Sequence, residues 1–146
     1  HEMGAEISWN GNEVTVKGPE HLKAGTFDLN AIPDTLPILA VTAAMAEGTT
    51  RLGNVPQARI KETDRISCMR ENLALLGVNA EEEEDALIIH GNGYVKGGSV
   101  KGFSDHRIVM ALASLSAGAS GDIIIDDESA ASITFPSFFR LLSSLR

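Results

Sequence analysis

Alternation of apolar and polar residues predicts a pair of short strands near the start of the chain, and a matching pair is expected later. Ala5–Trp9 and Glu13–Lys17 flank Asn10-Gly11, a sequence typical of a type I′ hairpin turn. Val78–Glu82 and Ala86–His90 are the matching strands later in the chain. Because successive side chains of a strand point to opposite faces, each hairpin should turn one face to water.

Longer and more apolar segments predict helices, with further short strands between them. The expected helices are Asp34–Glu47, ended by Gly48, Thr63–Leu76, closed by Gly77, Asp105–Ala117 and Thr134–Leu145. The expected strands are Gly25–Leu29, Thr49–Asn54, Ser99–Phe103 and Asp122–Asp126. Two helices are apolar nearly all round, over Thr35–Ala46 and Arg107–Ala119, which is typical of buried helices. The pattern predicts an α+β fold with helices inside and sheets outside.

The pattern repeats along the chain at a constant offset. When Gly4 is set over Gly77, Val14–Val16 falls over Leu87–Ile89 and Gly18 over Gly91. A two-residue deletion in the second copy brings Asp34 over Asp105 and Thr63 over Thr134. We expect one repeat unit at about 3–75 and a second at about 76–146. His1–Gly4 matches the end of a helix whose body would precede it, so we expect a fragment of a longer repeating protein.

Composition excludes several classes of protein. Hydrophobic residues make up 43% of the 146 residues, enough for a core, and the lone Cys68 excludes a disulfide framework and is expected in that core. A net charge of −8 and an aromatic content of 5% argue against nucleic acid as a partner. The apolar stretches Leu36–Ala46 and Ile108–Ala119 are shorter than the roughly 18 residues of a membrane span, and no signal peptide is recognisable. We therefore expect a cytoplasmic protein that makes no membrane contact.

Charged residues gather just before one predicted helix. Gln57–Arg65 holds three cations and two carboxylates, ahead of a helix for which Thr63 is the expected N-cap. Lys61 and Arg65 beside the free N–H groups of a helix start would favour a bound anion, and Glu62 could move a proton. The alternative is a solvated cluster whose charges pair with one another.

A second charged group precedes the apolar helix of the second unit. Asp105, His106 and Arg107 stand there, and Asp34 holds the equivalent place in the first unit. Either aspartate could simply cap its helix, with nothing bound nearby. If the helices pack in parallel, however, their positive ends converge and gather these side chains. The expected ligand is then a small polyanion, such as a phosphorylated carboxylate, which a local field can hold because screening by salt acts over about 8–10 Å.

Four segments carry a resemblance to a known enzyme family. In order and spacing, they resemble the C-terminal third of the EPSP synthases (3-phosphoshikimate 1-carboxyvinyltransferases). The segments are Asp28–Asp34 (DLNAIPD), Arg59–Arg65 (RIKETDR), Asp105–Arg107 (DHR), and Thr134–Pro136 (TFP) followed by Phe138 and Phe139. The resemblance covers nearly the entire chain. It implies an inside-out α/β barrel domain built from βαβαββ units, of which about two are present.

The resemblance also implies an activity. Enzymes of this family join phosphoenolpyruvate to the 5-hydroxyl of shikimate 3-phosphate and release phosphate, on the route to aromatic amino acids. Their chemistry uses no metal and no organic cofactor. Carried onto this sequence, Asp34 would act as the base toward the 5-hydroxyl, and Glu62 would handle the proton at the methylene carbon.

The same carry-over assigns the substrate contacts. Lys61, Asn30 and Gln57 would contact shikimate 3-phosphate. Arg65 and Arg107 would hold the carboxylate of phosphoenolpyruvate, with His106 supporting that site. The family's N-terminal domain, which completes the cleft, would be missing, so the chain by itself should be inactive.

One position departs from the family. A lysine precedes the TFP segment in well-known members and contacts the phosphate of phosphoenolpyruvate, whereas this sequence has Ser132 and Ile133. By the repeat register Ile133 lies over Glu62 and should face the cleft. We interpret the change as a weakened phosphate site or a trait of a subfamily. Two alternatives stay open: a non-catalytic binding or assembly module of the same fold, and a relative of the UDP-N-acetylglucosamine enolpyruvyl transferases.

Overall fold

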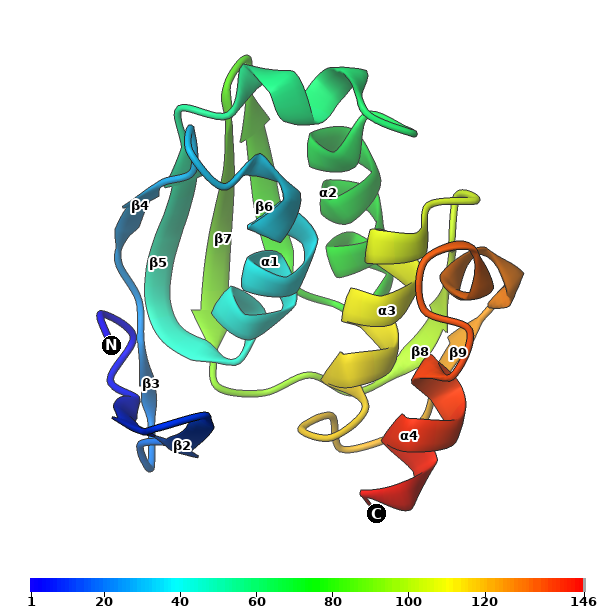
Figure 1. Ribbon diagram of the computed structural model, residues 1–146. Helices are drawn as coiled ribbons and strands as arrows, with labels where there is room; N and C mark the ends of the chain where they lie inside the picture. The colour runs from blue at the N-terminus through cyan, green and yellow to red at the C-terminus, as the bar shows by residue number, and fades with distance from the viewer. Residues whose placement is uncertain (146) are drawn as a thin grey trace.

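The computed structural model describes residues 1–145 and consists of three helices between sheets (Figure 1). Arg146, the last residue of the second expected unit, lies outside the described residues. The main sheet contains β3 (Leu22–Lys23), β4 (Thr26–Asp28), β5 (Ala46–Gly53), β7 (Ala86–Asn92) and β6 (Asn79–Glu83). Two smaller sheets pair β1 (Glu6–Asn10) with β2 (Glu13–Lys17), and β8 (Gly98–Val100) with β9 (Ile123–Ile125).

The buried layer is formed by α1 (Leu36–Ala44), α2 (Arg65–Leu75) and α3 (His106–Leu115). In Figure 1, α1 and α2 cover one face of the main sheet, and α3 lies between α1 and the β8–β9 pair. Short 3-10 helices precede three of the helices: η1 (Pro33–Thr35) before α1, η2 (Pro56–Ile60) before α2, and η3 (Ser129–Ile133) before α4 (Phe138–Ser144). The predicted α+β fold, with helices inside and sheets outside, is confirmed.

One hydrophobic core joins the helices to the main sheet. Leu36 of α1, Leu73 of α2, Leu87 of β7 and Ile108 of α3 are all fully buried in it. Burying one such side chain contributes about 1.5–3 kcal/mol. Cys68 packs against this core as predicted, and burial raises the pKa of its thiol. In the described part of the chain, no helix combines the length and apolarity that crossing a bilayer needs.

The element order recurs with the offset expected from the sequence. Hairpin β1–β2 begins at Glu6 and hairpin β6–β7 at Asn79, a separation equal to the offset of the sequence repeat. The first residues of η2 and η3 are separated by the same offset. The second copy therefore regains the original register after α3. As a consequence Ile133 falls over Ile60, not over Glu62 as the sequence register suggested.

Three predicted boundaries are wrong for identifiable reasons. Gly48 lies within β5 and not at a helix end, because β5 pairs with β7 from Glu47 onward and takes residues assigned to the helix. Helix α4 begins at Phe138 and not at Thr134. Pro136 disfavours the helical conformation at the residue before it, and it has no N–H to donate within a helix. The first hairpin turns through Gly11 and Asn12, and of these only Gly11 has a positive φ, so the turn is not type I′.

Candidate functional site

The starts of α1, α2 and α3 meet at one place. Arg65, the first residue of α2, donates from Nη1 to Oδ1 of Asp34 in η1 at 2.8 Å. The same side chain donates from Nε to Oδ2 of Asp105, the N-cap of α3, at 2.8 Å. The expected convergence of three helix starts is therefore confirmed by direct contacts.

Arg65 is the buried centre of this group. Only 1% of its side chain is exposed, and Nη2 donates to Oε2 of Glu62 at 2.6 Å and to Oδ1 of Asp105 at 3.3 Å. Burial works against its charge. The hydrogen bond to Asp105 and the fields of Asp105, Glu62 and Asp34 outweigh that effect and raise the pKa of Arg65. The guanidinium therefore stays charged and is enclosed by three carboxylates.

Asp34 lies beside three cations that come from two segments of the chain. Besides Arg65, it lies 3.5 Å from Nζ of Lys61 and 3.1 Å from Nη2 of Arg107. Burial by itself would raise the pKa of Asp34. The fields of Arg107, Lys61 and Arg65 are stronger and hold the pKa of Asp34 below its ordinary value. Asp34 is thus an ionised acceptor at neutral pH.

Glu62 connects the network to His106. Its Oε1 lies 3.7 Å from Nδ1 of His106, while Oε2 accepts from Arg65. The His106 ring is buried, whereas nearly half of the Glu62 side chain is exposed. Glu62 is therefore a half-exposed carboxylate beside a buried imidazole, an arrangement suited to proton transfer. We refer to Asp34, Lys61, Glu62, Arg65, Asp105, His106 and Arg107 as the ion network.

Asn30 and Gln57 form a separate polar pair. Nε2 of Gln57 donates to the backbone carbonyl of Asn30 at 3.1 Å and to its Oδ1 at 3.0 Å. Asp28 orients this loop by accepting from the Asn30 N–H and from Nδ2 of Asn54, each at 2.9 Å. The Oε1 atom of Gln57 is buried and has no hydrogen-bond partner within residues 1–145.

The loop that carries Lys61 and Glu62 is held by its neighbours. Asp64, not Thr63, caps α2 by accepting from the Ser67 N–H at 3.0 Å. Arg59 binds Asp64 at 2.7 Å and donates to the carbonyl oxygens of Glu83 and Glu84. The cap belongs to Asp64 because Arg59 holds that carboxylate in place. The charged cluster is thus self-paired, as the alternative interpretation held, but it is not solvated at Arg65.

The hollows of the molecule do not coincide with the whole network. Asp34 and Arg107 line a cavity of about 210 Å³ together with Ile38, Met110 and Phe138. Larger hollows of about 560 and 700 Å³ contain no member of the ion network. Charge convergence, and not volume, therefore marks the candidate site. Across the described residues, no group of three or more His, Cys, Asp or Glu side chains could hold a metal ion.

Comparison with known proteins decides the family. The family model for EPSP synthase (3-phosphoshikimate 1-carboxyvinyltransferase) matches residues 1–142. The chain belongs to the EPSP synthase family. The 3-phosphoshikimate 1-carboxyvinyltransferase of Ruminiclostridium cellulolyticum is 46% identical over 143 residues, which cover 98% of this chain and 33% of that protein. That of Methanosarcina acetivorans is 47% identical over 146 residues, covering 99% of this chain and 34% of the relative.

Solved structures agree with this family. An EPSP synthase from Acinetobacter baumannii superposes with a TM-score of 0.83 at 30% identity, over 97% of this chain and 36% of that one. The enolpyruvyl transferase NikO from Streptomyces tendae shares the fold, with a TM-score of 0.80 at 19% identity, over 99% of this chain and 33% of its own. The chain thus spans about a third of the length of the EPSP synthases that it matches.

The sequence interpretation missed the role of Asp105. It identified this residue only as a helix cap, whereas Asp105 is fully buried and neutralises Arg65. The sequence did contain a signal for this role, because an aspartate, Asp34 or Asp105, stands at the equivalent place before each apolar helix. A buried cation needs carboxylate partners of this kind. Ile133 is 74% exposed on η3, so its aliphatic side chain contacts little of the described protein.

Proposed function

We propose that this chain supplies part of the active site of an enolpyruvyl transferase that joins phosphoenolpyruvate to the 5-hydroxyl of shikimate 3-phosphate and releases phosphate. The single observation that carries the proposal is the ion network, in which three carboxylates and three cations from separate segments meet at helix starts. The partners in this proposal are the two substrates and the rest of the enzyme. The proposed location is the cytoplasm.

The accessible cations of the network are the ones suited to bind the anionic substrates. The side chains of Lys61 and Arg107 are 32% and 40% exposed, whereas Arg65 is enclosed. In this proposal Arg107 meets the carboxylate of phosphoenolpyruvate, and Lys61 lies near the reacting centre. Arg65 fixes Asp34 and Glu62, and direct contact with a ligand would require it to exchange one of its carboxylate partners.

The low pKa of Asp34 fits a base that becomes stronger when substrate arrives. An anion bound to Lys61 and Arg107 offsets their fields at Asp34, and the pKa of Asp34 then rises. A base is more effective as its pKa approaches the working pH. Asp34 would then accept the proton of the 5-hydroxyl, while Glu62 exchanges a proton with the methylene carbon.

The polar pair supports the sugar-acid end of the proposed site. The buried Oε1 of Gln57 has no partner in the described part of the chain, and Asn30 lies beside it. In this proposal the Gln57 side chain turns toward the bound substrate, and a substrate hydroxyl that donates to Oε1 removes the cost of an unsatisfied acceptor. We therefore assign both residues to shikimate 3-phosphate.

A chimeric enzyme tests the proposal. The last third of the Ruminiclostridium cellulolyticum enzyme is replaced by this chain, and phosphate release is measured with both substrates. We expect turnover by the chimera, none by the isolated chain, and a large loss of kcat in the chimera carrying Glu62→Gln. A folded chimera that binds shikimate 3-phosphate but releases no phosphate would favour the non-catalytic module. Turnover with a UDP-sugar acceptor in its place would favour the other relative.

A further inference from the structure

The loop that carries Lys61 and Glu62 has little packing of its own. Both residues are exposed, and the neighbouring Ile60 is 83% exposed. Within residues 1–145, neither Lys61 nor Glu62 makes a backbone–backbone hydrogen bond. Their side chains contact Asp34 and Arg65, but in the proposed function these contacts change when substrate binds. The loop therefore needs a support that does not pass through its reacting groups.

The side chain of Arg59 provides such a support. Its Nη1 donates to Oδ2 of Asp64 at 2.7 Å, so one ion pair joins the two ends of the loop. Its Nε donates to the carbonyl oxygen of Glu84 at 2.8 Å, and Nη2 donates to that of Glu83 at 2.6 Å. Both carbonyls lie at the turn of the β6–β7 hairpin, which belongs to the main sheet. We call these three bonds the Arg59 clamp.

The clamp depends on the shape of a guanidinium group. Each of the three side-chain nitrogens of Arg59 has its own acceptor, and the planar group holds all three directions fixed. A lysine ends in one nitrogen on a flexible chain. Lysine at this place could keep the ion pair with Asp64 but would lose the simultaneous bonds to the sheet.

The second repeat unit lacks this clamp. At the repeat offset, Ser132 takes the place of Arg59 and Ser137 takes the place of Asp64. The Ser132 hydroxyl donates to the carbonyl oxygen of Ser129, and Ser137 precedes α4 without a side-chain cap hydrogen bond. In the described part of the chain, neither serine joins the two ends of its loop.

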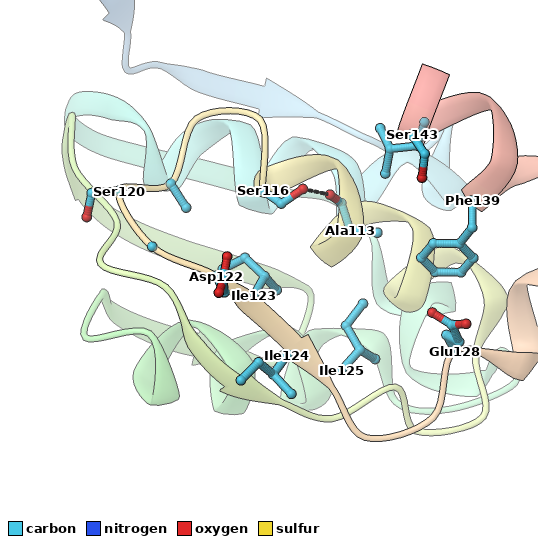
Figure 2. A pocket seen from close by; sticks show the side chains of 13 residues that line it. Ala113, Ser116, Ser120, Asp122, Ile123, Ile124, Ile125, Glu128, Phe139 and Ser143 are labelled. Carbon is cyan, nitrogen blue, oxygen red and sulfur yellow. Dashed lines mark hydrogen bonds between the residues drawn. The ribbon is translucent and has the colours of Figure 1, made fainter. Parts of the chain in front are cut away.

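Aromatic contacts support the equivalent loop instead. Phe135 and Phe138 stand at the places of Glu62 and Arg65, and their ring centroids lie 5.8 Å apart in an edge-to-face arrangement. Figure 2 shows the ring of Phe139, the next residue, at the hollow beside α3 and β9. This ring packs against buried apolar residues of α3 and η3. The first unit carries charged groups at the two corresponding places, so it cannot use aromatic packing there.

We propose that Arg59 is a positioning residue for the transfer reaction and acts on kcat through Glu62. The clamp fixes the loop to the main sheet and so holds the Glu62 carboxylate in place for its proton transfer, while Arg59 itself contacts no substrate. Arg107 lies on α3, which Asp105 caps, so the grip on the carboxylate of phosphoenolpyruvate does not depend on the clamp. This inference rests on the proposed function.

Steady-state kinetics of the chimera tests the effect on turnover. We expect Arg59→Lys to lower kcat about tenfold or more, because small displacements of a catalytic group are costly. The KM for phosphoenolpyruvate should stay within about twofold of the parent value. Arg70→Ala is the matched control, since Arg70 also lies beside Glu82, with Nε 3.8 Å from Oε1, and has no contact with the loop. It should leave kcat and KM unchanged.

A double variant separates positioning from a general structural role. If Arg59 acts through Glu62, adding Arg59→Lys to the Glu62→Gln chimera should lower the residual kcat by less than about twofold. A further tenfold loss in that background would overturn the proposal. An unchanged kcat in the single Arg59→Lys variant of an active chimera would overturn it as well.

Nuclear magnetic resonance of the full chain tests the clamp without turnover. Backbone order parameters of Lys61 and Glu62 should be close to the rigid value of about 0.85 in the parent and should fall below about 0.6 in Arg59→Lys. Arg70→Ala should keep the parent values. Order parameters that are already low in the parent, or that Arg59→Lys leaves unchanged in a folded chain, would overturn the proposal. A chimera without turnover would instead overturn the proposed function, and the order parameters would still decide whether Arg59 holds the loop.

Discussion

Arg65 and Asp105 bury their charges against each other across the starts of α2 and α3. Their Nε and Oδ2 atoms lie 2.8 Å apart, and 1% and 0% of the two side chains are exposed. Asp105 also accepts the N–H of Arg107 at 2.8 Å. One carboxylate therefore caps α3, neutralises the central cation and positions the backbone from which Arg107 projects.

Removing the charge of Asp105 should destabilise the fold. Asp105→Asn keeps an amide oxygen that can cap α3 but leaves Arg65 with a weaker buried partner. We expect the free energy of unfolding to fall by about 3 kcal/mol, the cost typical of breaking a buried ion pair. Urea unfolding followed by circular dichroism measures it.

An exposed aspartate that accepts a backbone N–H two residues further along serves as the control. Asp127 is exposed and accepts the Ser129 N–H at 2.8 Å at the start of η3. Asp127→Asn should change the urea midpoint very little. If both variants lose the same stability, the burial of the Arg65–Asp105 pair is not what makes Asp105 important.

Acidification should weaken the ion network through Asp34. Its pKa in the folded chain lies below the ordinary 3.8, so ionised Asp34 stabilises the fold at and above that pH. The contribution is lost as the pH falls through 3.8 and then through the lower folded value. Asp34→Asn should therefore flatten the dependence of unfolding free energy on pH in this acidic window. An unchanged slope, equal to that of the control Glu84→Gln, would contradict the linkage.

Gln57 should affect binding more than stability, if the proposed function holds. Gln57→Leu removes the buried Oε1 acceptor and the two bonds to Asn30. We expect stability to change by about 1 kcal/mol or less, and the KM for shikimate 3-phosphate in the chimera to rise roughly tenfold with little change in kcat. Steady-state kinetics on the chimera measures both. A lower kcat with an unchanged KM would contradict this assignment.

Two equivalent glycines should respond differently to alanine. Gly91→Ala forces a Cβ against the carbonyl oxygens of Ala43 and Ala46 and should cost about 1–3 kcal/mol of stability. Gly18→Ala meets no described atom and should stay within about 0.5 kcal/mol of the parent. Urea unfolding at low protein concentration compares them. Equal losses would show that close packing is not the reason for glycine at 91.

Much of the fold was predictable because its signals are local. The alternation in the first hairpin and the internal repeat established the order of elements, and the observed hairpins start where the repeat requires. The predicted boundaries were wrong where a pairing partner lies far along the chain. Gly48 became part of β5 because β7 pairs with it through Gly91, a contact that no window of sequence around Gly48 contains.

The candidate site was also predicted where its signals are local and missed where distant segments decide. Adjacent Thr63 and Asp64 are both good caps by residue type, and the contact of Asp64 with Arg59 selected the second. Arg65 was expected to face the ligand, since sequence reports its charge but not its surroundings. Packing of α3 beside α2 brought Asp105 to it and enclosed it.

The sequence by itself determined the kinds of groups present and the elements that carry them, since periodicity, caps and motifs depend on neighbours in the chain. It placed Asp34, Glu62 and Arg107 at or near helix starts. Only the tertiary structure decided which cation is buried and which remain accessible, because burial depends on what other segments bring.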